Sequence, residues 1–492
     1  MSLFQFLREY FPDSIVPARG LTGITADSRR VVPGNLFAAL PGTQHDGAHY
    51  ISQAIAAGAT MILVAEEDYE RLALACHPTV QFLCAKDPRA VFAKMAAAFH
   101  EVQPETCVAV TGTNGKSSVV DFVRQLWTLK GHQAASIGTL GIKGPMPKTH
   151  GGLTTPDPFV LHGQLAQLAV THHVTHCALE ASSHGLDQRR LDGIRFKAAA
   201  FTQLTQDHLD YHITMEAYFR AKKRLFEELI TSMGACILNA DVAEYATLRA
   251  IALKRRLHVL DYGKNAQALV LHKIVPHEEG QQLHVEIFGR QIQWSLPLIG
   301  QFQAYNFLCA LGLALASETK TETLLDLLAD YKELPIQSVT GRLERIVHAG
   351  KTVYVDYAHT PDALKHVLTT IRPHVKGRII VVFGCGGERD DLKRPLMGQI
   401  AEQLGDYVVI TDDNPRNEDP AQIRHNIRTG MKGRVPIQDI ADRRKAIAHA
   451  LSEASPTDAV LIAGKGHETT LLIRGVEHPF SDQGVVREIL RG

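Results

Sequence analysis

The chain has 492 residues, which is too long for one hydrophobic core and predicts about three domains. Lysine plus arginine and aspartate plus glutamate each number 52, so no net charge attracts nucleic acid or an anionic membrane. Seven cysteines without metal-ligand spacing indicate a reducing compartment rather than a disulfide framework. Residues 1–16 lack a signal-peptide core, and no apolar segment reaches the roughly 20 residues of a membrane helix. We therefore expect a soluble, cytoplasmic protein.

The pattern of apolar residues predicts an α/β fold with three domains. The first hundred residues hold a strand-like run at 61–65 and an alanine-rich helical stretch at 91–100, and the polar run 103–106 is typical of a linker. Apolar strands then alternate with amphipathic helices as far as a second boundary near 332–341. We expect a small α/β domain, a central P-loop ATPase-type parallel-sheet domain and a C-terminal Rossmann-like domain, at residues 1–102, 103–335 and 336–492.

Residues 110–119, Val-Thr-Gly-Thr-Asn-Gly-Lys-Ser-Ser-Val, are the most informative stretch of the chain. An apolar run at 107–110 leads into a glycine-containing turn, and a helical pattern follows. The N–H groups of such a turn, together with the helix N-terminus, bind phosphate. Lys116 can reach the terminal phosphates, and the Ser117 hydroxyl suits Mg²⁺. The full P-loop pattern requires glycine where Val110 stands, so we interpret the stretch as a shortened variant; a plain Gly/Asn turn is the alternative.

The helix after this turn has one apolar face that should pack on the sheet. We expect Gly131 to end it, and the face consists of Val119, Val120, Val123, Leu126 and Trp127.

The last 150 residues repeat one arrangement, in which an apolar strand ends in a polar or glycine-rich turn. The predicted strands are 352–355, 379–383, 407–410 and 459–462. Ligands of open parallel sheets bind at the carboxyl ends of strands. These four turns therefore predict a binding rim.

Three further segments carry candidate catalytic groups. Glu180 ends the apolar run 174–179 and suits Mg²⁺, although a Ser/Glu helix cap is the alternative. The stretch 205–212 places two aspartates and two histidines, among them His208, close together, and one or two of them could bind metal. Lys222, taken by itself, is interpreted as one charge on a helical face.

The turn Asp413-Asn414-Pro415-Arg416 combines a carboxylate, an amide and a guanidinium. Asp413 would repel phosphate, but the turn suits a zwitterion, whose ammonium meets the carboxylate while its carboxylate meets the arginine. Arg389 and Glu468, in other strand-end turns, could supply a second pair of opposite charges. A salt-bridged surface turn is the alternative at each site.

These motifs together resemble the Mur ligase family, and among its members the ligases that add diaminopimelate. The resemblance covers essentially the whole chain, in order, and rests on spaced motifs: DSR 27–29, GTNGKSS 112–118, TTP 154–156, EASSHGL 180–186, DHLDYH 207–212, AK 221–222, GRLE 341–344, DYAHTPD 356–362, GERD 387–390, DNPR 413–416 and GKGHE 464–468. The chain departs from the usual pattern at Leu153, Gln303, Ala304 and Glu388.

The resemblance implies an ATP-dependent ligase of peptidoglycan precursor synthesis. ATP would phosphorylate the D-glutamate carboxylate of a UDP-muramoyl dipeptide, and the amine of meso-diaminopimelate would attack the acyl phosphate. The implied ATP contacts are Gly112, Thr113, Asn114, Gly115, Lys116, Ser117, Ser118, Asn306, Arg342 and Asp356. Implied catalytic and Mg²⁺-site residues are Lys116, Ser117, Glu180, His208 and Lys222, the last as a CO₂-derived carbamate, which replaces the interpretation of Lys222 as a plain surface charge.

The same resemblance implies two substrate sites. Residues 1–102 would be the UDP-binding domain, and the UDP-substrate site would comprise Ser28, Thr154, Thr155, Ser182, Gln188 and Arg190. The amino-acid site would comprise Arg389, Asp413, Asn414, Pro415, Arg416, Gly464 and Glu468. Arg416 would favour diaminopimelate over lysine, because lysine leaves the guanidinium unpaired, and such sites discriminate by roughly 10⁴-fold. We expect a monomer acting on small molecules, without nucleic acid or membrane.

Three alternatives remain open. A lysine-adding sibling is disfavoured by the Asp413–Arg416 turn, and a folylpolyglutamate synthetase is disfavoured by the N-terminal domain. A nucleotide-binding regulator without catalysis is disfavoured by the presence of Lys116, Glu180, His208 and Lys222.

Overall fold

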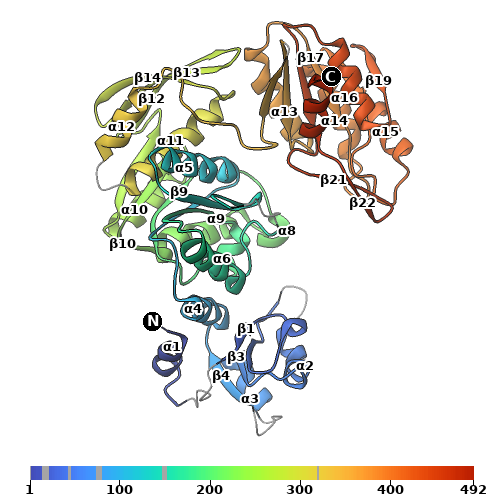
Figure 1. Ribbon diagram of the computed structural model, residues 1–492. Helices are drawn as coiled ribbons and strands as arrows, with labels where there is room; N and C mark the ends of the chain where they lie inside the picture. The colour runs from blue at the N-terminus through green and yellow to red at the C-terminus, as the bar shows by residue number, and fades with distance from the viewer. Residues whose placement is uncertain are drawn as a thin grey trace. The chain divides into compact units, whose positions relative to one another are not determined.

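The computed structural model describes residues 2–13, 21–42, 46–73, 80–146, 152–317, 321–348 and 350–491 (Figure 1). The chain forms two compact units, one of Met1–Gln267 with Cys309–Leu324 and one of Ala268–Leu308 with Leu325–Gly492. In these described ranges, none of the helices has the length and apolar character that crossing a membrane requires.

The first hundred residues form a parallel sheet with strand order β1-β2-β3-β4. Its strands are β1 (Gly23–Thr25), β2 (Asn35–Ala38), β3 (Met61–Ala65) and β4 (Gln81–Ala85). The helices are α1 (Leu3–Tyr10), η1 (Ser28–Arg30), η2 (Gly47–Tyr50), α2 (Ile51–Ala56), α3 (Glu66–Ala73) and α4 (Pro88–His100). Apolar side chains of α4 pack with those of β2 and β3 in one core. The predicted strand at 61–65 and helix at 91–100 are confirmed.

The central part of the first unit is a larger, mostly parallel sheet with the order β11-β10-β9-β5-β8-β6-β7. Only β7 runs antiparallel to its neighbour β6. The strands are β5 (Thr106–Thr111), β6 (Ala134–Gly138), β7 (Gly141–Lys143), β8 (His176–Glu180), β9 (Phe196–Phe201), β10 (Ile230–Asn239) and β11 (His258–Gly263). Its helices are α5 (Lys116–Leu129), α6 (Pro158–Thr171), α7 (Ser183–Asp187), α8 (Leu209–His212), α9 (Met215–Arg224), η3 (Leu225–Leu229) and α10 (Tyr245–Lys254).

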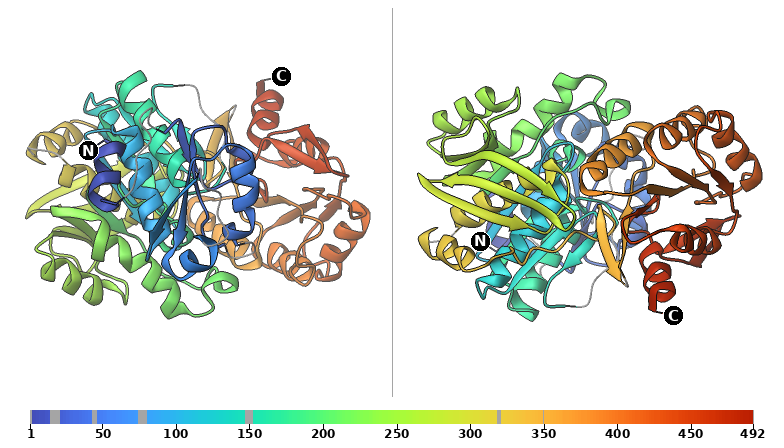
Figure 2. Two further views of the ribbon diagram at one scale, coloured as in Figure 1. Left: turned by 90° about the horizontal axis from the view of Figure 1, so that it is seen from below. Right: turned by 90° about the horizontal axis from the view of Figure 1, so that it is seen from above.

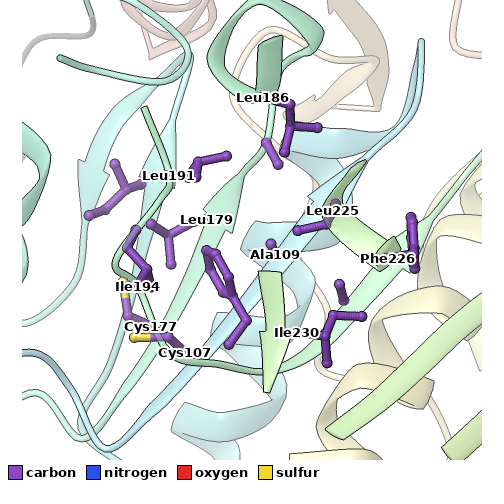
Figure 3. Packing of buried hydrophobic residues seen from close by; sticks show 14 of the residues in the cluster. Cys107, Ala109, Cys177, Leu179, Leu186, Leu191, Ile194, Leu225, Phe226 and Ile230 are labelled. Carbon is purple, nitrogen blue, oxygen red and sulfur yellow. The ribbon is translucent and has the colours of Figure 1, made fainter. Parts of the chain in front are cut away.

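The middle strands of this sheet are buried on both faces, which explains why they read as continuous apolar runs. Figure 3 shows part of that core, to which β5 contributes Cys107 and Ala109 and β8 contributes Cys177 and Leu179. The five apolar residues predicted for one face of α5 are all buried. Gly131 follows that helix with a φ of 92°, as expected of a helix-ending glycine.

The second unit begins with an antiparallel meander. Its strands are β12 (Leu269–His277), β13 (Gly280–Ile287) and β14 (Arg290–Leu296). The helix α11 (Gln301–Ser317) begins in this unit and continues into the first, and α12 (Thr321–Ala329) likewise has residues in both.

The C-terminal sheet has the order β15-β16-β20-β17-β18-β19, and only β15 is antiparallel. Its strands are β15 (Glu344–His348), β16 (Lys351–Asp356), β17 (Ile379–Phe383), β18 (Tyr407–Ile410), β19 (Ile437–Asp439) and β20 (Ala459–Ala463), and a hairpin adds β21 (Thr470–Ile473) and β22 (Val476–Pro479). The helices are α13 (Pro361–Ile371), η4 (Arg372–His374), α14 (Lys393–Leu404), α15 (Pro420–Thr429), α16 (Arg443–Glu453) and α17 (Asp482–Arg491).

Helices cover both faces of this C-terminal sheet (Figure 2). Alternate strand residues pack against α13, α14 and α15 on one face and against α16 and α17 on the other. The four strands predicted in this region are confirmed, as is the α/β class. The exact domain boundaries stay a prediction.

Candidate functional site

The turn between β5 and α5 has the geometry of a phosphate-binding loop. Gly115 caps the helix N-terminus at a φ of 89°, where a side chain would be strained. Gly112 has a φ of 143°, and a Cβ there would lie 1.9 Å from Oγ1 of Thr202. Lys116 Nζ donates to the carbonyl oxygens of Gly112 and Thr113 at 2.9 and 2.8 Å. The lysine is therefore folded back over the loop to which phosphates would bind.

Residues after β9 hold this loop in place. The hydroxyl of Thr202 donates to the Asn114 carbonyl at 2.6 Å. Thr113 Oγ1 accepts from the Thr205 N–H at 3.0 Å and lies 3.2 Å from the Tyr218 hydroxyl. Ser118 is buried in the first turn of α5. Three side-chain and backbone contacts from residues after β9 therefore hold the loop.

Lys222, on α9, lies beneath the same loop. It is 1% exposed, its Nζ donates to the Gly112 carbonyl at 2.8 Å, and it lies 4.3 Å from the centre of the Tyr218 ring. Burial lowers the pKa of Lys222 well below its usual value, with the charge of Lys116 acting in the same direction and that of Asp207 opposing it. The interpretation of Lys222 as a surface charge is wrong, because tertiary packing turns this face of α9 inward.

Glu180 ends β8 with a carboxylate that is 3% exposed. Its two oxygens accept from the N–H and the hydroxyl of Thr139 at 2.9 and 3.2 Å. A Cβ on Gly138 would lie 2.1 Å from Glu180 Oε1, so the carboxylate occupies the space that this glycine leaves. Glu180 and Ser117 line one small cavity. The helix cap that was the alternative role is made by Ser182, which accepts from the Gly185 N–H at 3.0 Å.

His208 lies in a group of rings at the start of α8. It has a left-handed φ of 53°, and its ring centre lies 4.8 Å from that of His184 and 6.1 Å from that of Tyr218. Its Nε2 lies 3.5 Å from Asp207 Oδ2. Within the described ranges, no three or more His, Cys, Asp or Glu side chains gather closely enough to hold a metal. The metal role of the 205–212 stretch stays a prediction.

A cavity of about 670 Å³ lies between α4, β2 and the segments around 153–158 and 188–190. Its lining includes Ser28, Arg89, Asp157, Gln188 and Arg190. Arg29 lines the cavity too, and its three arginines suit a phosphate-containing ligand.

The remaining residues predicted for the UDP-substrate site form one hydrogen-bonded chain beside this cavity. Thr154 and Thr139 share a hydroxyl contact of 3.0 Å, and Thr155 and Ser182 share another of 3.0 Å. Arg190 donates to the Thr155 carbonyl at 2.7 Å and to Gln188 Oε1 at 2.7 Å. The structure thus connects the predicted substrate residues with those around Glu180.

In the second unit, the turn after β18 contains four of the residues predicted to bind the amino-acid substrate, Asp413–Arg416. Arg416 has a φ of 53°, its N–H donates to the Leu472 carbonyl at 3.0 Å, and its guanidinium donates to the Gly387 carbonyl. Asn414 donates to Glu468 Oε2 at 2.8 Å. Pro415 is buried, whereas Arg389 is exposed after β17.

Lys465 was not among the predicted site residues, although it lies at their centre. It is fully buried, and its Nζ contacts Glu468 Oε2 at 2.9 Å and Asn414 Oδ1 at 3.1 Å. Its position between two glycines after an apolar run could have identified it. Glu468 is therefore already ion-paired, and the cation that it meets in the structure is Lys465.

A buried ion pair lies next to the turn Asp413–Arg416. Arg443 contacts Asp482 through two hydrogen bonds of 2.7 and 2.8 Å, and it donates to the Ala463 carbonyl at 3.0 Å. Its Nη1 lies 3.9 Å from Asp413 Oδ2. Gly464 has a φ of 114°, and a Cβ there would lie 2.6 Å from that same oxygen. Asp413 is thus held by charge and by close packing.

The predicted nucleotide contacts of the second unit lie on α11 and at β15 and β16. Asn306 donates to Gln303 Oε1 at 3.0 Å, so one departure from the family pattern supplies a partner for it. Asp356 accepts from the N–H groups of Leu343 and Ala358 at 2.7 and 2.8 Å, and burial raises its pKa in spite of the charge of Arg342.

Comparison with known families places this chain in a class. Residues 20–100 match the catalytic domain of the Mur ligase family, residues 110–314 match the Mur ligase middle domain, and residues 341–466 match the Mur ligase glutamate ligase domain. The three matched domains follow one another along the chain, and the phosphate-binding loop lies in the middle one. The protein belongs to the Mur ligase family of ATP-dependent ligases.

Within this family, individual relatives cover nearly the whole chain. UDP-N-acetylmuramoyl-L-alanyl-D-glutamate–2,6-diaminopimelate ligase of Agrobacterium fabrum is 44% identical over 97% of this chain and 94% of its own. The ligases of the same name from Caulobacter vibrioides and Brucella melitensis are 45% and 46% identical, over 99% and 96% of this chain and 98% and 94% of their own.

Solved structures agree with this placement. A structure of a UDP-N-acetylmuramoyl-L-alanyl-D-glutamate–2,6-diaminopimelate ligase has a TM-score of 0.73 at 32% identity and covers 99% of this chain and 98% of its own. A folylpolyglutamate synthase from Mycobacterium tuberculosis shares the fold at a TM-score of 0.58 and 18% identity, covering 76% of this chain and 92% of its own.

Proposed function

We propose that this protein is an ATP-dependent amide ligase that joins meso-2,6-diaminopimelate to the D-glutamate of UDP-N-acetylmuramoyl-L-alanyl-D-glutamate. The reaction belongs to peptidoglycan precursor synthesis in the cytoplasm. The observation that carries the proposal is the turn Asp413–Arg416, joined to Glu468 and Lys465, in a chain whose relatives of 42–46% identity are named for this activity.

The chemistry requires an activated carboxylate. The γ-carboxylate oxygen of the D-glutamate attacks the terminal phosphorus of ATP, and the bond to the ADP oxygen breaks. The amine of diaminopimelate then attacks the carbonyl carbon of the acyl phosphate, loses a proton, and displaces phosphate. The first step brings two anions together, and the second develops negative charge on the carbonyl oxygen beside the phosphate, so a cation must offset the charge in both. Lys116, at the phosphate loop, supplies that charge from a position that needs only side-chain rotation.

The residues around the loop suit a magnesium ion. Ser117 and Glu180 face one cavity, and a hydroxyl and a carboxylate are ligands that Mg²⁺ prefers. Mg²⁺, when bound, neutralises phosphate charge. His208 is a further candidate ligand at the same end of the sheet.

Lys222 suits modification to a carbamate. Its burial and lowered pKa favour the neutral amine, whose lone pair attacks the carbon of CO₂ and which then loses a proton. The resulting anion would give this buried position a ligand for a second Mg²⁺. The N–H that remains can still donate to the Gly112 carbonyl, which orients the group.

The amino-acid site should select a substrate with two zwitterionic ends. Arg416 would bind the distal carboxylate, while Asp413 would face the distal ammonium. Lysine has no distal carboxylate, so its binding leaves the guanidinium without an anion. We infer that a monomer with three small-molecule substrates is sufficient, and that neither nucleic acid nor membrane takes part.

The deciding experiment is phosphate release by the purified protein with Mg·ATP and UDP-N-acetylmuramoyl-L-Ala-D-Glu. Parallel reactions contain meso-diaminopimelate, L-lysine or no amine. We expect sustained release only with diaminopimelate, together with an amide-linked tripeptide product detected by mass spectrometry.

The other outcomes separate the alternatives. Release with L-lysine instead would keep the ligase class and contradict the role of the Asp413–Arg416 turn. No release in any reaction, with ATP still bound, would favour a regulator without catalysis.

A further inference from the structure

Two loops of the C-terminal sheet, which carry different candidate sites, pack directly against each other. The nucleotide loop is residues 341–343 with 356–358, and the amino-acid loop is residues 464–468. A Cβ on Gly341 would lie 2.2 Å from the backbone nitrogen of His467, and one on Gly466 would lie 2.6 Å from the Tyr357 Cβ. At these distances neither loop can shift without affecting the other.

One buried side chain connects the two loops by hydrogen bonds. Gln483, in the first turn of α17, is 4% exposed. Its Nε2 donates to the Gly466 carbonyl at 2.8 Å and to Glu344 Oε2 at 3.1 Å. Its Oε1 accepts from the Ser481 hydroxyl at 3.0 Å, which fixes the orientation of the amide.

Glu344 extends this connection to the nucleotide loop. Its Oε2 also accepts from the Gly341 N–H at 3.0 Å, and its Oε1 pairs with Arg487 at 2.9 Å. Gly341 precedes Arg342, whose guanidinium carbon lies 5.0 Å from the centre of the Tyr357 ring. Three hydrogen bonds therefore connect Gly466 to the residue before Arg342. The Gln483 amide donates two of them, and the Glu344 carboxylate accepts the third from the Gly341 N–H.

We propose that Gln483 is a positioning residue that sets the amino-acid loop and the nucleotide loop in one geometry. This inference rests on the proposed ligase function. The side-chain amide of Gln483 donates one hydrogen toward each loop, and both of these hydrogen bonds are buried. Without the amide, the Gly466 carbonyl loses this donor, and Glu344 keeps its bonds to the Gly341 N–H and to Arg487 but is no longer tied to the amino-acid loop.

The first test replaces Gln483 with methionine, which has a similar length and no donor. We expect the KM values for meso-diaminopimelate and for ATP each to rise by about tenfold, because the Gly466 carbonyl and Glu344, which holds the Gly341 N–H, each lose one buried hydrogen bond. The KM for the UDP-muramoyl dipeptide should not change, because its predicted site lies in the first unit. Gln403→Met, an exposed glutamine on α14, is the matched control and should behave as the wild type.

The second test separates the two hydrogen bonds. In Gln483→Glu combined with Glu344→Gln, the amide at position 344 can donate to the carboxylate at position 483 while still accepting from the Gly341 N–H. The Gly466 carbonyl stays without a donor. The ATP KM should therefore return close to that of the wild type, while the diaminopimelate KM stays raised.

A role in folding alone predicts a different result. If Gln483→Met lowers kcat through loss of active protein and leaves all three KM values unchanged, the proposal is wrong. A double variant that restores both KM values, or neither, would also contradict the assigned path. If the wild type shows no amine-dependent phosphate release, the ligase function itself fails, which is distinguishable from both results.

Discussion

Replacing Arg416 with alanine should weaken amino-acid binding without weakening ATP binding. The guanidinium uses one nitrogen on the Gly387 carbonyl, which leaves its other edge for a two-pronged contact with a carboxylate. A charge-assisted hydrogen-bonded contact of this kind contributes about 1.5–3 kcal/mol. Its loss corresponds to a rise of about 10- to 150-fold in the KM for meso-diaminopimelate. Alanine keeps the Cβ, so the cost of the left-handed backbone at this position is unchanged.

The assay is the initial rate of phosphate release, with each substrate varied in turn. Arg428→Ala, which removes an exposed arginine from α15, is the matched control and should leave every KM unchanged. The preference for diaminopimelate over L-lysine, as a ratio of kcat/KM values, should fall in Arg416→Ala. An equal rise in the KM values for ATP and diaminopimelate would refute the role of Arg416, because it would indicate distortion of the domain rather than loss of a substrate contact.

Four further outcomes follow from buried groups. Lys222→Ala should lower kcat by about 100-fold or more, with partial recovery on adding formate but not formamide; full activity without additive would contradict a carbamate. Because the folded-state pKa of Lys222 lies below its usual value, the unfolded chain binds more protons between the two values. Stability against urea should therefore rise with pH across that window, and Lys222→Met should flatten the rise. Arg443→Met should cost about 3–5 kcal/mol in urea denaturation by stranding the buried Asp482, and adding Asp482→Leu should recover most of it. Gly138→Ala should raise the Mg²⁺ concentration needed for half-maximal activity, because its Cβ would meet Glu180; an unchanged Mg²⁺ dependence would separate Glu180 from the metal.

The sequence predicted the strand–turn–helix framework well, because that framework depends on local signals. The apolar runs at 379–383 and 459–462 are strands since they are buried on both faces and end at turn-forming residues. The phosphate loop could be predicted although Val110 stands where the usual pattern has its first glycine, because the strand before the loop and the helix after it are still recognisable.

The supporting residues could not be predicted in this way, because their partners are distant in the chain. Gln483 bonds to Glu344, which precedes it by 139 residues, and Lys222 bonds to Gly112 across 110 residues. The spacing of residues along the sequence does not reveal such distant pairs. By its helical periodicity Lys222 resembles any solvated lysine, and only the packing of α9 against the loop reveals its burial.

The close packing of Gly341 and Gly466 also limits how this protein can be redesigned. The segments before β15 and after β20 have no room for a single extra carbon at these points, so their surfaces are closely complementary in shape. Transplanting the 464–468 segment from a ligase that adds another amino acid would bring in a surface made for a different counterpart. A successful graft must carry both segments, together with the residue at position 483 that joins them, as one module.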